Sequence, residues 1–158
     1  MQTLAPPRPA PLWFIDNLAR VHVRGAETGG RYALVEVCGR RGDMPPLHVH
    51  HREDETFYVL DGALSLHVPG RSLELAAGSA FVAPRGVPHA YRVESETARW
   101  LAFCAPAGFD ALVLETSEPA ERDELPPPGR RHDVAALAAA AARQDIELLG
   151  PPGTLPGA

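Results

Sequence analysis

The chain has 158 residues, a length typical of one domain, and a formal net charge of −5 at pH 7. This charge balance has no basic excess, so it disfavours a nucleic-acid partner. No apolar run is long enough to span a bilayer and no apolar signal segment lies near the start, so we expect neither a membrane partner nor secretion. The two cysteines, Cys38 and Cys104, lie in apolar stretches and are expected to be buried free thiols, which fits a reducing cytoplasm.

Residues 1–17 begin with a Pro-rich stretch, which predicts an extended N-terminal arm. Its apolar residues 12–15 (LWFI) are expected to pack in the core, with closure of a barrel mouth or contact with a partner subunit as alternatives. Residues 18–106 contain short β-rich stretches separated by Gly and Pro turns. Strands are expected at 18–24, 32–37, from 47 onward, 56–60, 63–68, 72–75, 80–83, 90–93 and 98–104. Short strands with no helix among them predict an all-β sandwich or barrel.

Residues 107–158 differ in character and are expected to be a C-terminal extension with a linker and a helix. A short helix is expected at 109–115, followed by a polar, Pro-rich linker. Asp133 is a suitable N-cap for a second helix, whose apolar residues recur at helical spacing. We expect this helix to end near 146–149, before Gly150 and two prolines.

The chemistry-bearing residues gather in the stretch from Gly42 to Gly62, which contains His48, His50 and Glu55. Side chains two apart on a strand share a face, so the two histidines aim their imidazoles at one place. Glu55 is an odd number of residues away and needs a bulge or turn over residues 51–54 to join them. Two imidazoles and a carboxylate are half of a divalent-metal site.

A second stretch, GSAFVAPRGVPH, begins at Gly78 and ends at His89, the best candidate for a fourth ligand. Together the two stretches resemble the motif pair of the cupin family. The first motif, G-x5-H-x-H-x4-E-x6-G, is kept in full. The second, G-x5-P-x-G-x2-H-x3-N, is kept except that Val93 replaces the final Asn, which is not a ligand in the family.

The resemblance implies a cupin jelly-roll β-barrel over residues 18–106 with one metal inside, and a homodimer, since cupins commonly dimerise. It assigns His48, His50, Glu55 and His89 as the metal ligands. Neutral imidazoles and a carboxylate suit Fe, Mn, Ni, Cu, Co or Zn, and the residues do not choose among these metals. Glu53 and Asp54 are neighbouring acids, but the family spacing selects Glu55. Glu55 is also the candidate catalytic base.

Apolar side chains are expected to form the walls of a substrate pocket around this site. Phe57 and Val59 share the parity of Glu55, and Tyr91 shares that of His89. Phe103 is expected to join them, with Phe81 as another candidate. An aromatic-lined metal cavity suits a small hydrophobic or aromatic substrate. The alternative is that these side chains simply fill the barrel.

Three functions follow as hypotheses. The run HVHHREDETFYVLDG is similar to that of small bacterial quercetin 2,3-dioxygenase-like cupins, which implies a dioxygenase whose metal holds an enol or phenol substrate and whose Glu55 takes the substrate proton. The second hypothesis is a non-redox isomerase, cyclase, lyase or hydrolase that uses the metal as a Lewis acid. The third is a small-molecule-binding cupin without catalysis, because this fold hosts many functions.

Overall fold

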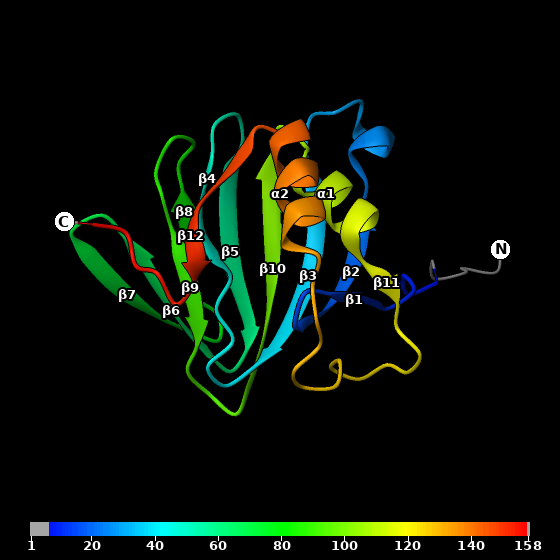
Figure 1. Cartoon of the computed structure of the whole chain (residues 1–158), viewed down its shortest axis with the longest axis horizontal. Coiled ribbons are helices and arrows are strands. Elements are labelled where there is room, and N and C mark those ends of the chain that lie inside the picture. Colours follow the sequence, from blue (N-terminus) through cyan, green and yellow to red (C-terminus); the bar gives the residue numbers. More distant parts are fainter. Residues whose placement is uncertain (1–6, 158) are drawn as a thin grey trace, which may run out of the picture.

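The computed structural model describes residues 7–157, of which just under half lie in antiparallel strands (Figure 1). A large sheet forms one layer of the barrel. Its strands, in spatial order, are β11 (Glu118–Pro119), β1 (Leu12–Phe14), β2 (Asn17–Val23), β3 (Ala33–Arg40), β10 (Thr97–Ala105), β5 (Asp54–Asp61) and β8 (Ala80–Ala83). The predicted all-β fold is therefore confirmed.

The facing layer is assembled from two smaller sheets. One contains β7 (Arg71–Ala76), β6 (Ala63–Val68) and β9 (Ala90–Val93), and the other pairs β12 (Ile146–Pro152) with β4 (Pro46–His50). Two backbone hydrogen bonds join them, from His89 N–H to the carbonyl of His48 (2.9 Å) and from His48 N–H to the carbonyl of His89 (3.3 Å). Two of the predicted ligands thus lie side by side at the seam of this layer.

The core fills the space between the two layers. Alternate residues of each strand point into it, as the period of a β-strand requires. Trp100, Phe57, Val35 and Leu66 are among its fully buried members, each exposing 1% of its surface or less. Phe14 on β1 belongs to the same cluster, which confirms core packing for this residue of the apolar LWFI segment.

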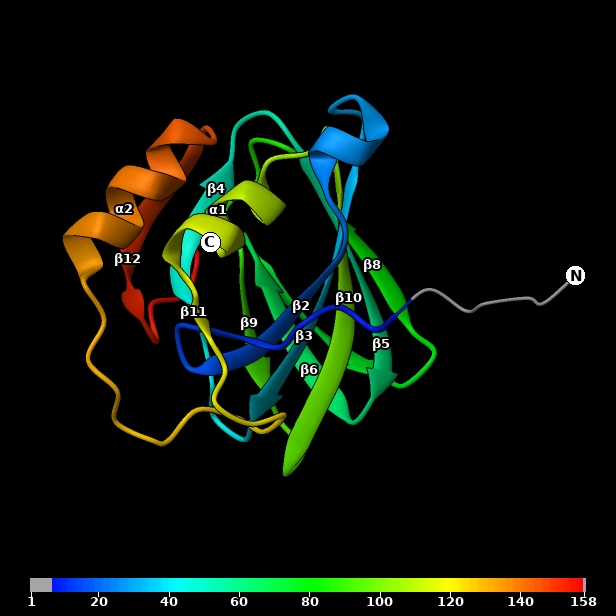
Figure 2. The same cartoon turned by 90° about the vertical axis from the view of Figure 1, so that its right-hand side faces the viewer.

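Three helical segments cover one side and one end of the barrel: η1 (Gly25–Thr28), α1 (Phe109–Thr116) and α2 (Val134–Arg143). Helices α1 and α2 lie side by side (Figures 1 and 2), and Arg143 forms an ion pair with Glu115 between them. The predicted N-cap is confirmed, because Asp133 accepts the N–H of Ala136 (2.9 Å). Leu137 of α2 is buried against the core.

The predicted end of the second helix is wrong. Helix α2 stops at Arg143, and the backbone reverses through Asp145, whose φ of 56° is left-handed. From Ile146 onward burial follows strand periodicity, with Ile146 buried and Glu147 exposed, and this strand pairs with β4. The C-terminal extension therefore contributes a strand to the barrel layer that carries the histidines.

The remaining expectations concern the chain ends, the thiols and the membrane. Residues 1–6 of the predicted arm lie outside the described residues, and β1 forms within the rest of it. Cys104 is buried and Cys38 half-buried, and both are free. Within residues 7–157, no helix combines the length and the apolar character that crossing a bilayer would require.

The structure predicts that β12 stabilises the barrel. Ile146 is 2% exposed in the core, so Ile146→Ala should lower the free energy of unfolding by about 2–4 kcal/mol through lost burial and an unfilled cavity. Leu149→Ala, on the same strand but 43% exposed, is the matched control and should change it by less than about 1 kcal/mol. Urea denaturation measures both, and equal effects would contradict the described packing of β12.

Candidate metal centre

Both layers of the barrel contribute to one cluster of polar side chains. Strand β4 carries His48 and His50, and His89 directly precedes β9 in the same layer. Glu55 comes from β5 of the opposite sheet. The chain bends at residues 51–52 as it crosses from β4 to β5, so a turn does bring the odd-spaced carboxylate back to the histidines.

The four side chains offer ligand atoms that all lie within 4.8 Å of one another. His50, Glu55 and His89 are buried, with exposures of 2%, 4% and 1%, and His48 is half-buried. The imidazole rings of His50 and His89 are stacked, with centroids 5.4 Å apart. The residues predicted as ligands are therefore brought together in one place.

Each histidine ring is held by its Nδ1 atom. Nδ1 of His48 lies 2.8 Å from the carbonyl of Pro46, and Nδ1 of His89 lies 2.9 Å from the carbonyl of Val87. Nδ1 of His50 lies 2.5 Å from Oε1 of Glu53. Because these acceptors are oxygens, each Nδ1 is placed to donate its proton. In the neutral ring Nε2 then has the lone pair that binds a metal.

The carboxylate of Glu55 lies at the centre of the cluster. Its Oε2 is 3.0 Å from Nε2 of His89 and 3.1 Å from Nε2 of His50. Burial favours the neutral acid, but the charge of His50 and the hydrogen bond with His89 outweigh it and hold the pKa of Glu55 below its usual range. Glu55 is therefore ionised at neutral pH and available as a ligand.

The histidines differ in their electrostatic environment. Burial, together with the neighbouring His89 and His50, lowers the pKa of His48 to about 3. Burial also opposes the charged form of His50, yet the carboxylates of Glu55 and Glu53 raise its pKa to about 10. Without a metal the cluster is thus held together by a buried ion pair between His50 and Glu55.

A divalent metal fits this donor set. Among the described residues, Nε2 of His50 is a buried nitrogen with no hydrogen-bond partner, because its approach to Glu55 lacks hydrogen-bond geometry. Such an orphaned atom is costly unless something else satisfies it. Three imidazole nitrogens and one carboxylate around a common point would satisfy it with a transition metal.

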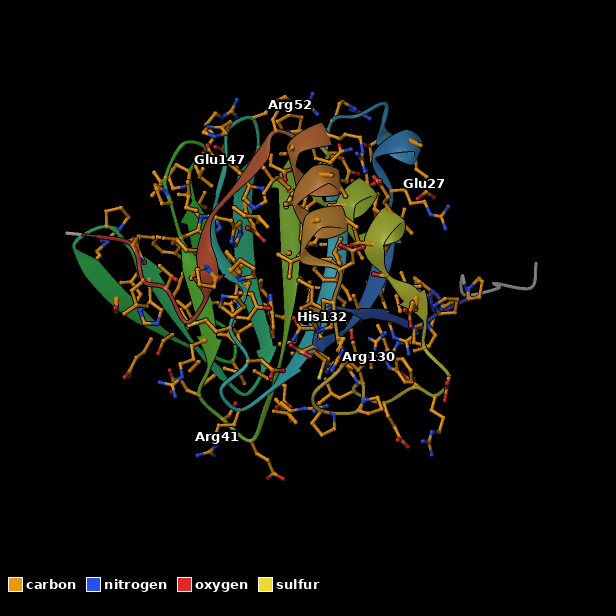
Figure 3. All side chains as sticks on the ribbon, viewed as in Figure 1. Glu27, Arg41, Arg52, Arg130, His132 and Glu147 are labelled. Carbon is orange, nitrogen blue, oxygen red and sulfur yellow. The ribbon has the colours of Figure 1, made fainter. Side chains whose placement is uncertain are left out.

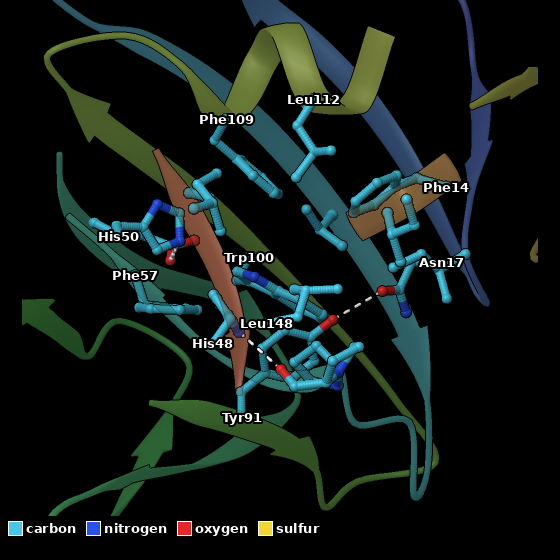
Figure 4. Close-up of a pocket in the computed structure, with 18 residues that line it drawn as sticks. Phe14, Asn17, His48, His50, Phe57, Tyr91, Trp100, Phe109, Leu112 and Leu148 are labelled. Atoms are coloured by element: carbon cyan, nitrogen blue, oxygen red, sulfur yellow. Dashed lines mark hydrogen bonds and ion pairs between the residues drawn. The ribbon is translucent and has the colours of Figure 1, made fainter. Parts of the chain in front are cut away.

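A cavity of about 60 Å³ opens beside the cluster, and apolar side chains form most of its wall (Figure 4). Of the predicted pocket residues, Phe57 and Tyr91 line it. Val59 is fully buried but packs in the core away from the cavity. Burial raises the pKa of Tyr91, so its hydroxyl stays protonated and donates to Oδ1 of Asn17 (2.8 Å).

The prediction for Phe103 is wrong. Phe103 lies on β10 between Leu34 of β3 and Thr56 of β5. Its side chain points out of the barrel, where it is 38% exposed and packs against Tyr32, with 5.3 Å between the ring centroids. Its neighbour Ala102 faces the cavity instead. The alternation of Trp100, Ala102 and Cys104, all buried, is the signal in the sequence that places Phe103 outside.

Much of the cavity wall comes from segments that the sequence did not connect with the site. They are helices α1 and α2 and strand β12, whereas for residues 12–15 closure of a barrel mouth is among the alternatives that the sequence offers. The lining residues from these segments, from β1 and β2 and from the loop between those two strands are Phe14, Ile15, Asn17, Phe109, Leu112, Leu137, Ile146 and Leu148. Contacts between distant parts of the chain leave no signal in the local sequence. Of these segments, only β12 could have been recognised, because its alternation of apolar and polar residues is typical of a strand.

Charged residues surround the cluster at the surface, and His51, Arg52 and Arg85 are all exposed. Nε2 of His51 lies 2.8 Å from a carboxylate oxygen of Glu147. Arg52 and Glu147 lie at the same end of the molecule (Figure 3). Arg85 pairs with Asp54, whose side chain is 41% exposed and lies outside the group of candidate ligand atoms.

The barrel and its donor set agree with the cupin resemblance, and residues 36–104 match the family model described as "Cupin domain". The chain therefore contains a cupin domain, and all four candidate ligands lie inside the matched range.

The chain is similar to a quercetin 2,3-dioxygenase of Bacillus subtilis (strain 168), with 33% identity over 114 residues. The alignment covers 72% of this chain and 34% of that enzyme, so the chain spans about a third of that relative's length.

Solved structures share the fold. KdgF from Halomonas sp. is 23% identical with a TM-score of 0.56, and the match covers 63% of this chain and 90% of that one. The polyketide cyclase RemF from Streptomyces resistomycificus is 24% identical with a TM-score of 0.52, covering 66% and 79%. At these identities the likeness shows the fold alone.

The donor set predicts the behaviour of single-ligand variants. His50→Ala and His89→Ala should each lose the metal, about one ion per chain, that the wild type retains, because three remaining donors hold it more weakly. His51→Ala, which removes the exposed neighbour, should keep it. Plasma mass spectrometry of protein purified without a metal-binding tag measures this. Stoichiometric metal in both ligand variants would refute the four-ligand site.

Proposed function

We propose that the protein is a metal-dependent dioxygenase that acts on a small aromatic or enolisable substrate. The observation that carries this proposal is the position of the donor set: His48, His50 and Glu55 form part of the wall of an otherwise mostly apolar cavity. The similarity to a quercetin 2,3-dioxygenase supports it, since that enzyme's name describes dioxygen chemistry on a flavonol.

The residues of the chain have separable roles in this reaction. Glu55 is an ionised, buried carboxylate on the cavity wall, so it can accept the proton of an enol or phenol substrate. A transition metal, when bound, supplies Lewis acidity to the substrate oxygen and a route for electrons to dioxygen. Phe57 and Phe109 exclude water from the reacting groups. Both oxygen atoms enter the substrate, which supplies the electrons, so no separate reductant is needed.

The cavity favours a compact substrate. Its volume of about 60 Å³ is well below the roughly 300–1,000 Å³ of common small-molecule pockets. A three-ring flavonol is much larger than this volume, so we expect a substrate of one ring. The hydroxyl of Tyr91 and the amide of Asn17 offer polar contacts on the wall to a second oxygen of the substrate.

Non-redox chemistry is the competing function, because an ionised Glu55 beside a Lewis-acidic metal also suits isomerisation, cyclisation or elimination. The two functions differ in their need for dioxygen. The third possibility, ligand binding without catalysis, differs from both in giving no product.

An oxygen-electrode assay tests the proposal on protein loaded in turn with Fe, Mn, Ni, Cu, Co or Zn. We expect oxygen uptake with a one-ring enol such as a cyclic β-diketone, or with catechol, and less with quercetin. Glu55→Gln should lower the rate by about 100-fold or more, because the base is lost, and His51→Ala should preserve it. Metal content is measured in parallel, since Glu55 is also a ligand.

Two outcomes would overturn this proposal. Conversion of the same substrates at an unchanged rate under nitrogen would assign the site to Lewis-acid chemistry. Saturable binding without product, under every metal, would assign it to ligand binding.

A further inference from the structure

The three histidines of the cluster are not held alike. Backbone carbonyls accept from Nδ1 of His48 and His89, whereas the carboxylate of Glu53 lies at Nδ1 of His50, 2.5 Å away. A carboxylate behind an imidazole fixes the ring orientation and makes the opposite nitrogen a stronger electron donor. His50 is thus the ligand whose donor strength depends on a second side chain.

Glu53 is itself built into the fold. It lies in the connection between β4 and β5 and is 2% exposed. Its second oxygen, Oε2, accepts the backbone N–H of Phe109 (3.2 Å), the first residue of α1. At Gly108 an added Cβ would lie 3.0 Å from that oxygen, so the backbone of the N-cap residue packs directly against the carboxylate.

Burying this carboxylate has a cost that its partners offset only in part. Burial raises the pKa of Glu53, and the hydrogen bonds from His50 and Phe109 oppose that rise. Glu53 therefore joins β4 to the start of α1, and its contact with Nδ1 places it to act on His50.

We propose that Glu53 is a positioning residue: it orients His50 and strengthens it as a metal ligand, while it anchors the start of α1 beside the cluster. The inference rests on the proposed metal centre. Glu53 lies behind Nδ1 and is outside the group of ligand atoms around Nε2, so it acts through His50.

The same carboxylate connects the metal centre to the wall of the cavity. The ring of Phe109 lines the cavity and lies 6.3 Å from that of His50, measured between centroids. Glu53 therefore contacts both a candidate metal ligand and the start of the helix that carries a residue of the cavity wall.

The test is a titration of metal-free protein with Co²⁺ and with Zn²⁺ by calorimetry, with the visible Co²⁺ spectrum recorded in parallel. Glu53→Ala should weaken binding by about 10- to 100-fold and alter the Co²⁺ band positions. Glu53→Gln should weaken it less, because an amide oxygen still accepts the Nδ1 proton but is uncharged. The matched control is Asp54→Asn, an adjacent exposed acid, which should stay within about threefold of wild type.

Thermal denaturation of the metal-free proteins separates this role from a purely structural one. If both Glu53 variants melt earlier but bind Co²⁺ with wild-type affinity and spectrum, the inference is overturned while the metal centre stands. If the wild type itself binds neither metal, the proposed centre fails and the inference falls with it. Should Glu53→Ala not fold, the smaller change in Glu53→Gln decides the question.

Discussion

The constraint on which this structure depends is the burial of three imidazoles and a carboxylate inside an apolar barrel. Unpaired, such groups would cost several kcal/mol each. The fold meets this cost locally: backbone carbonyls of Pro46 and Val87 and the carboxylate of Glu53 each hold one ring. Glu55 then balances the remaining charge from the opposite layer. These contacts constrain the backbone at the seam between β4 and β9 and at the turn into β5.

The sequence predicted the donors better than their surroundings, and the reason is physical. The spacing of His48 and His50 on a strand fixes their common face whatever else the chain does. The end of α2 was missed because an alanine run has high helix propensity, and nothing in the sequence marks the left-handed turn at Asp145. Glu53 was one of three consecutive acids, and only the path of the turn separates its role from that of its neighbours.

The two kinds of residue in the site come from different parts of the chain. The ligands lie within residues 36–104, the range shared with the cupin model. Phe14 and Asn17 precede that range, and Phe109, Leu112 and Leu148 follow it, yet all five line the cavity. The common barrel therefore supplies the reactive centre, and segments outside it set the space available to a substrate. Proteins that share the barrel can differ in specificity without any change in the donors.

The pairing of β12 with β4 also has a consequence for biosynthesis. Strand β4 carries two of the ligands, but its outer edge is covered only by residues 146–152, about a hundred positions later in the chain. A nascent barrel that lacks β12 therefore presents an open strand edge next to two histidines, the kind of edge that other chains can pair with. Strand β12 covers this edge and also contributes Ile146 and Leu148 to the cavity wall, so one segment both protects the histidine-bearing strand and shapes the cavity beside it.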